Sequence, residues 1–182
     1  MKFVVAFLFF ITSLAGAAPQ PWSILHGCSY VPHANNDGDS FHVRCGADEF
    51  VLRLYFVDTP ETNLQYPERT REQAEHFGAT LDDTLKAGAL ARAFVRDALR
   101  GPFTVTTRKA SAPGRAKDPR FYGMVEVGGR NLDEMLVLRG LARAKGVAAS
   151  VPGEKARAHT QRLQVLEEQA KQKGLGLWAR KK

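Results

Sequence analysis

The sequence contains little of the material from which zinc sites are built. Only two cysteines, Cys28 and Cys45, occur among the 182 residues, and neither belongs to a CxxC pair. The five histidines show no ligand spacing relative to these cysteines. A structural zinc site, which takes four closely grouped cysteine and histidine ligands, is therefore not expected.

Long apolar runs, internal repeats and low-complexity segments are absent after residue 17. These absences exclude a multi-span membrane protein, a coiled coil and a collagen-like chain. Hydrophobic residues make up 44% of the chain and charged residues 25%, which is ordinary globular usage and argues against a disordered protein. A length of 182 residues suits one domain with a sizeable core.

Acidic residues are the minority charge. The chain has 26 Lys and Arg against 19 Asp and Glu, which gives a formal charge of +7. A basic balance favours an anionic partner such as nucleic acid, an acidic polymer or an anionic membrane. Composition alone does not choose among these partners.

The first 17 residues have the organisation of a secretory signal peptide. Lys2 provides a positive start, residues 3–14 are almost wholly apolar, and residues 15–17 form a small-residue cleavage site. We therefore expect export to the periplasm or the medium, a single domain over residues 18–182, and a monomer without membrane attachment. The alternative is an uncleaved membrane anchor, although the apolar run is short for spanning a bilayer.

Export decides how the two cysteines are interpreted. An oxidising compartment favours a disulfide between Cys28 and Cys45. Closing this short loop would stabilise the fold by about 3 kcal/mol in the chain-entropy model. The alternative is two free thiols.

Strands dominate the first half of the chain, and helices are mixed in later. Strand-forming residues and alternation predict strands over 40–44, 49–57, 103–107 and 121–127. Apolar residues at helical spacing predict helices over 90–99, 131–140 and 154–173. This order favours an α+β fold in which a small barrel or curled sheet packs on helices.

Two acidic clusters flank the early strands. Residues 37–39 read Asp-Gly-Asp and residues 58–61 read Asp-Thr-Pro-Glu. Pro60 lacks an N–H and holds Thr59 extended, so carboxylates and a free carbonyl project from the strand end. Hard divalent cations prefer such oxygen ligands. The alternatives are a hairpin turn for the first cluster and a strand terminator with a helix cap for the second.

Arg53 lies inside an apolar strand, on the face opposite to Leu52 and Leu54. A guanidinium in that position needs a carboxylate or a phosphate as its partner. The alternative is a structural ion pair with a neighbouring strand. Plain alternation also places Arg53 and Asp58 on opposite faces, so a shared site requires a twist or bulge near the strand end.

Together these features resemble the staphylococcal nuclease (thermonuclease) family. The resemblance rests on the aspartates at 37 and 39, the run Arg-Leu-Tyr-Phe-Val-Asp-Thr-Pro-Glu over 53–61, Arg120 ten residues before Arg130, and Gly-Leu-Ala-Arg over 140–143. It extends from about residue 37 to Trp178. It implies an α+β fold with a five-stranded OB-type β-barrel packed against three or more α-helices.

The resemblance also implies an activity and its cofactor. Family members hydrolyse phosphodiester bonds of DNA and RNA with little sugar specificity, and they use one Ca²⁺. The implied metal ligands are the carboxylates of Asp39 and Asp58 and the backbone carbonyl of Thr59, with Asp37 in the outer shell.

The remaining implied roles belong to catalysis and substrate binding. By resemblance, Glu61 orients or deprotonates the attacking water as a general base. Arg53 and Arg120 grip the phosphate and stabilise the transition state, and Lys117 contacts a substrate phosphate.

Three positions depart from the family pattern. Asp118 stands where the family has a tyrosine two residues before its second catalytic Arg, and Gly146 and Ala148 stand where the family has two tyrosines that flank the nucleotide, so base stacking is in question. The segment 62–85 is longer than usual and is predicted to add a helix or a flap over the site. Two other classes remain open: a non-catalytic OB-fold module that binds nucleic acid, and an exported structural domain that binds an acidic polymer without metal dependence.

Overall fold

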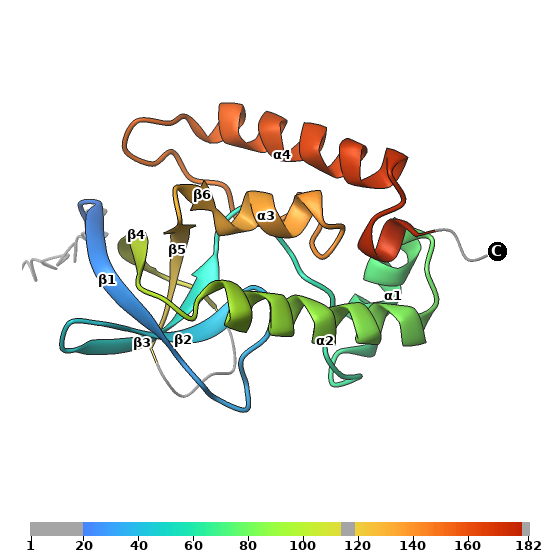
Figure 1. Cartoon of the computed structure of the whole chain (residues 1–182), viewed down its shortest axis with the longest axis horizontal. Helices are drawn as coiled ribbons and strands as arrows, with labels where there is room; N and C mark the ends of the chain where they lie inside the picture. Colours follow the sequence, from blue (N-terminus) through green and yellow to red (C-terminus); the bar gives the residue numbers. More distant parts are fainter. Residues whose placement is uncertain (1–19, 114–118, 180–182) are drawn as a thin grey trace, which may run out of the picture.

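A computed structural model describes residues 20–113 and 119–179 of the chain (Figure 1). The strands are β1 (Ser23–Val31), β2 (Ser40–Cys45), β3 (Asp48–Leu54), β4 (Phe103–Ser111), β5 (Arg120–Val127) and β6 (Arg130–Asn131). The helices are α1 (Pro67–Phe77), α2 (Leu81–Ala98), α3 (Leu132–Leu138), α4 (Ala156–Gln172) and the short 3₁₀ helix η1 (Gly176–Trp178). Within these ranges, no helix is both long enough and apolar enough to span a bilayer.

The strands form one sheet that closes on itself. Their order is β3-β2-β1-β4-β5-β6, and an additional parallel pairing of β3 with β5 completes the ring. The other pairings are antiparallel. Helices α2 and α3 lie beside the barrel, α4 runs along α3, and α1 lies near the far end of α2 (Figure 1). The predicted α+β fold, an OB-type barrel with three or more helices, is confirmed.

The barrel interior and the inner faces of the helices share one hydrophobic core. Buried side chains of the strands include Phe41, Leu52, Leu54, Val105 and Val125, and those of the helices include Ala91, Val95, Leu132, Leu136 and Leu163. Fully burying a leucine, valine or phenylalanine contributes about 1.5–3 kcal/mol. This core therefore fixes the frame on which the polar groups at the barrel edge are held.

Strand β1 (Ser23–Val31) is a long strand that the sequence did not predict individually. Its register against β4 shifts between Leu25 and Cys28, and Gly27 between them has a φ of 68°. This irregularity interrupts the alternation by which a strand is recognised.

Helix α2 begins nine residues before the predicted start at residue 90. Thr80 caps it, because the Thr80 hydroxyl accepts the N–H of Asp83 at 3.1 Å. Helix α1 lies in the long segment 62–85, so the helix predicted there is present.

Strand β3 ends at Leu54 instead of the predicted Val57. Phe56 has a φ of 67°, a left-handed conformation that a regular strand does not contain. The N–H of Val57 bonds the carbonyl of Tyr55 at 2.9 Å, so the backbone turns sharply here. The turn breaks the alternation that would have placed Arg53 and Asp58 on opposite faces.

The disulfide between Cys28 and Cys45 is present, as predicted. It joins β1 to the end of β2, next to the pairing of Ser29 with Arg44. The cross-link therefore joins two neighbouring strands at the last residue of β2, whereas residues 37–39 precede its first residue.

Candidate active site

Two glycines allow the acidic segments to approach helix α2 closely. A Cβ at Gly38 would lie 2.8 Å from the side chains of Thr59 and Ala91, and a Cβ at Gly88 would lie 2.2 Å from the carbonyl oxygen of Glu61. No side chain fits at either position without movement of the backbone or of its neighbours. The turn before β2 and the segment after β3 are thereby pressed against the same helix.

Arg53 joins the two predicted metal-ligating aspartates. Its Nη1 donates to Asp39 Oδ1 in a short contact, and its Nη2 lies 3.3 Å from Asp58 Oδ1. Asp39 Oδ2 accepts the backbone N–H of Thr59 at 2.8 Å. Residues 39, 53, 58 and 59, which come from the turn before β2, from β3 and from the turn after β3, therefore meet at one place.

Asp37 lies beside this cluster and shapes the turn before β2. Its Oδ1 accepts the backbone N–H groups of Asp39 at 2.9 Å and Ser40 at 2.6 Å. Burial, with the added negative charge of Asp39, raises the pKa of Asp37 to about 8 despite the opposing charge of Arg53. The site thus holds several crowded acids.

Arg120 reaches the same place from β5. The parallel pairing puts Arg120 opposite Val51, two residues from Arg53. Arg120 Nη2 donates to Ser40 Oγ at 2.8 Å, and Arg53 Nη1 lies 3.5 Å from the same oxygen. The two guanidiniums therefore flank one hydroxyl at the barrel edge.

Asp58 is also bound by three residues to which the sequence analysis gave no role. Its Oδ2 accepts Arg143 Nε at 2.9 Å and Gln73 Nε2 at 2.9 Å. Its Oδ1 accepts Arg69 in addition to Arg53. Burial alone would raise the pKa of Asp58, but these donors outweigh burial and lower it.

Helix α1 supplies two of these donors. Arg69 and Gln73 are four residues apart and share one helical face. Gln73 donates to the carbonyl of Thr59 at 2.9 Å and accepts the N–H of Glu61 at 3.0 Å. An Arg and a Gln at this spacing, in a segment already predicted to cover the site, were the available signal.

Glu61 lies next to Asp58 and contacts Arg69. Arg69 Nε is 2.9 Å from Glu61 Oε1. Burial raises the pKa of Glu61, while Arg69 opposes that rise. A carboxylate of raised pKa is a better proton acceptor than a solvated one, which suits a general base.

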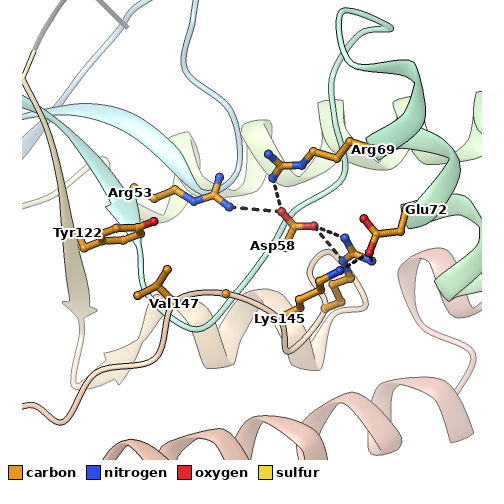
Figure 2. A pocket seen from close by; sticks show the side chains of 9 residues that line it. Arg53, Asp58, Arg69, Glu72, Tyr122, Lys145 and Val147 are labelled. Atoms are coloured by element: carbon orange, nitrogen blue, oxygen red, sulfur yellow. Dashed lines mark hydrogen bonds and ion pairs between the residues drawn. The ribbon is translucent and has the colours of Figure 1, made fainter. Parts of the chain in front are cut away.

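A pocket of about 340 Å³ opens beside the cluster. Its lining residues are Arg53, Asp58, Arg69, Glu72, Tyr122, Arg143, Lys145, Gly146 and Val147 (Figure 2). Tyr122 and Val147 form the less polar side, and guanidiniums form the other. The pocket therefore offers positive charge next to an apolar wall.

The tyrosine rings that the family resemblance implies are missing from this sequence at Asp118, Gly146 and Ala148. A Cβ at Gly146 would lie 2.8 Å from the backbone of Phe56 and Val57, so a tyrosine there would require the chain to shift. Lys117 and Asp118 lie outside the described residues. Tyr122 is the aromatic ring that lines the pocket.

The donor set around Asp58 suits a hard cation in its chemistry. Two carboxylates, Asp39 and Asp58, converge on the guanidinium of Arg53. The side-chain amide of Gln73 donates both to Asp58 Oδ2 and to the carbonyl of Thr59, so this carbonyl lies close to the same carboxylate. Oxygen ligands of this type match Ca²⁺. Among the described residues, no group of three or more His, Cys, Asp or Glu is arranged to hold a metal, and arginines bind the carboxylates instead.

The fold and this cluster define an OB-barrel domain with a charged site at the barrel edge. A protein-family model, "Staphylococcal nuclease homologue", matches residues 51–180, and the chain belongs to that family. The membership supports a nuclease-like, nucleic-acid-related function, and nucleases of the family are generally calcium-dependent. No curated protein matches the chain.

Proposed function

We propose that the protein is an exported, calcium-dependent nuclease that hydrolyses phosphodiester bonds of DNA and RNA with little sugar specificity. The observation that carries the proposal is the meeting of Asp39 and Asp58 at Arg53, with Arg120 beside it through Ser40. Acids and guanidiniums that converge from separate segments at the open edge of a barrel are typical of a site that binds a charged ligand.

Arg53 and Arg120 are proposed to bind the scissile phosphate. The transition state of phosphodiester hydrolysis gathers negative charge on the equatorial phosphate oxygens. Two preorganised guanidiniums stabilise the transition state more than they stabilise the ground state, and this difference accelerates the reaction.

The proposed cation would be held by the carboxylates of Asp39 and Asp58 and the carbonyl of Thr59, with Asp37 in the outer shell. When bound, Ca²⁺ would supply positive charge to the phosphate oxygens. The protein's own side chains position the phosphate and accept the proton of the attacking water. Arg53 is shared between the two acids, so it is fixed in position before substrate arrives.

Glu61 is proposed to accept the proton of the water that attacks phosphorus. Its carboxyl is partly buried and its pKa is raised by that burial, against the effect of Arg69. A positioned general base contributes about 10²–10⁴-fold to a rate.

Export, the cleaved signal peptide at 1–17 and the phosphate contact of Lys117 belong to the same proposal. The signal segment and Lys117 lie outside the described residues. The single domain over 18–182 and the monomeric state are likewise proposed.

The alternative is a non-catalytic OB-fold module that binds nucleic acid. It is favoured by the saturation of Asp58 with arginine donors, which leaves its oxygens occupied. Such a module would retain nucleic acid in the presence of Ca²⁺ without shortening it.

The deciding experiment uses the purified mature protein with single-stranded and duplex DNA and RNA. We expect cleavage of all of them with Ca²⁺ and none with EGTA, restored when Ca²⁺ is returned. Cleavage that persists in excess EGTA would disprove the calcium dependence. Intact nucleic acid that nevertheless binds the protein would establish the alternative.

A further inference from the structure

The carboxylate of Asp58 has more donors than a metal ligand can share. Oδ1 accepts from Arg53 and Arg69, and Oδ2 accepts from Gln73 and from two nitrogens of Arg143. Two carboxylate oxygens offer about four lone-pair positions in all. A cation can bind Asp58 only if one of these donors leaves.

Arg69 is the donor best able to leave. The side chains of Arg143 and Arg53 are 4% and 13% exposed, whereas that of Arg69 is 39% exposed. Arg53 is also tied to Asp39 and lies in the barrel wall. Arg69 lies on α1 at the rim of the pocket, so it has solvent and open space to move into.

Arg69 also provides the charge that a cation would provide. Its guanidinium bridges Asp58 and Glu61, with Nε 2.9 Å from Glu61 Oε1 and Nη2 on Asp58 Oδ1. A divalent ion placed on Asp58 Oδ1 would stand beside this guanidinium and repel it. The two positive groups therefore compete for the same carboxylate.

We propose that Arg69 is a built-in competitor of the divalent cation, one that neutralises Asp58 and Glu61 when the cation is absent and that cation binding displaces toward the pocket. The inference rests on the proposed function and adds to it a residue outside the family motif. Loss of Arg69 then has opposite effects on two states: it destabilises the cation-free protein and strengthens cation binding.

The test measures Ca²⁺ binding to the mature protein by titration calorimetry without substrate, together with the melting temperature with and without Ca²⁺. R69A is expected to bind Ca²⁺ about fivefold more tightly than the wild type, the effect of losing one part-exposed ion pair. Its melting temperature should fall without Ca²⁺ and recover with it. Equal or weaker binding by R69A overturns the proposal.

Two further variants keep the result interpretable. R71A removes an arginine of the same helix whose ion pair is with the exposed Glu68, away from Asp58, so its Ca²⁺ affinity should equal that of the wild type. R69Q keeps hydrogen-bond donors at the position and removes the charge. It should resemble R69A even if R69A folds poorly, and wild-type affinity in R69Q also overturns the proposal.

The outcomes separate this inference from the proposed function. If wild type and R69A bind Ca²⁺ equally, the competitor role is wrong and the calcium site stands. If neither binds Ca²⁺ at millimolar concentration, removal of Arg69 has opened no site, and the competitor role and the cofactor are both wrong. Tight binding by R69A alone establishes the competition directly.

Discussion

Two clusters of buried charge in this protein both consist of ion pairs but differ in what they do. At the barrel edge, Asp58 is surrounded by Arg53, Arg69 and Arg143 beside an open pocket. Between α3 and α4, His159 bonds Asp133 at 2.5 Å and Glu154 at 3.0 Å.

The two clusters differ in their exposure to solvent and in whether one member can exchange its ion-pair partners. His159 is only 1% exposed, and its two carboxylates hold α4 against α3 and the loop before α4. The Asp58 cluster contains one arginine, Arg69, that is partly exposed and has two acid partners. A closed cluster with fixed partners stabilises a fold, whereas an open one with exchangeable partners can bind a ligand.

The largest effect is expected at Glu61. E61Q removes the proton acceptor and keeps the shape, so turnover should fall by about 10²–10⁴-fold, while the melting temperature changes only by the loss of one part-exposed ion pair with Arg69. The control is E72Q, whose carboxylate lines the same pocket but pairs with Lys145 and Arg143. Nuclease assays on both variants check this, and full activity in E61Q would remove Glu61 from the mechanism.

Arg120 comes next. R120A removes one of two guanidiniums at Ser40, and turnover should fall by about 10²–10³-fold, as for loss of one transition-state donor. R44A is the matched control, because Arg44 pairs with the exposed Glu49. Equal activity in the two variants would place Arg120 outside the phosphate site.

The closed cluster should respond in stability and not in turnover. H159Q leaves the buried Asp133 without its cationic partner, so unfolding free energy should fall by about 3 kcal/mol. Activity per folded molecule should stay near that of the wild type. H76Q, at a more exposed pair with Glu167, should change little, and chemical denaturation measures all three proteins.

The smallest expected effect is the pH dependence of that stability. Burial alone would lower the pKa of His159, but Asp133 and Glu154 outweigh it and raise the pKa above its ordinary 6.5. The His159 contribution is therefore complete below about pH 6.5 and is lost as pH rises through the folded pKa. The stability difference between wild type and H159Q should shrink over that rise.

Glu154 sets the acid side of the same curve. Hydrogen bonds from Arg162 are the main cause that lowers its pKa from 4.5 to about 2, so its contribution is present above about pH 4.5 and is lost toward pH 2. Melting temperatures of wild type and E154Q across this range check it. A difference that grows toward pH 2 would contradict the assignment.

Much of the barrel could be predicted from local pattern. The alternation of Phe50, Leu52 and Leu54 predicted β3, and helical spacing predicted α2 and α4. Those signals are short in range, because each side chain needs only the period of its own element. The same locality explains the misplaced end of β3, since the left-handed turn at Phe56 leaves no mark in an apolar run.

The amino-acid sequence by itself determined which acids and arginines the site contains within its motif, because the run from Arg53 to Glu61 is contiguous. Only the tertiary structure decided which guanidinium faces which carboxylate. Arg143 meets Asp58 across 85 residues, and Arg69 meets it only because α1 folds back over the turn. Such pairings depend on how the barrel closes and on where α1 packs, and no local period in the chain encodes either.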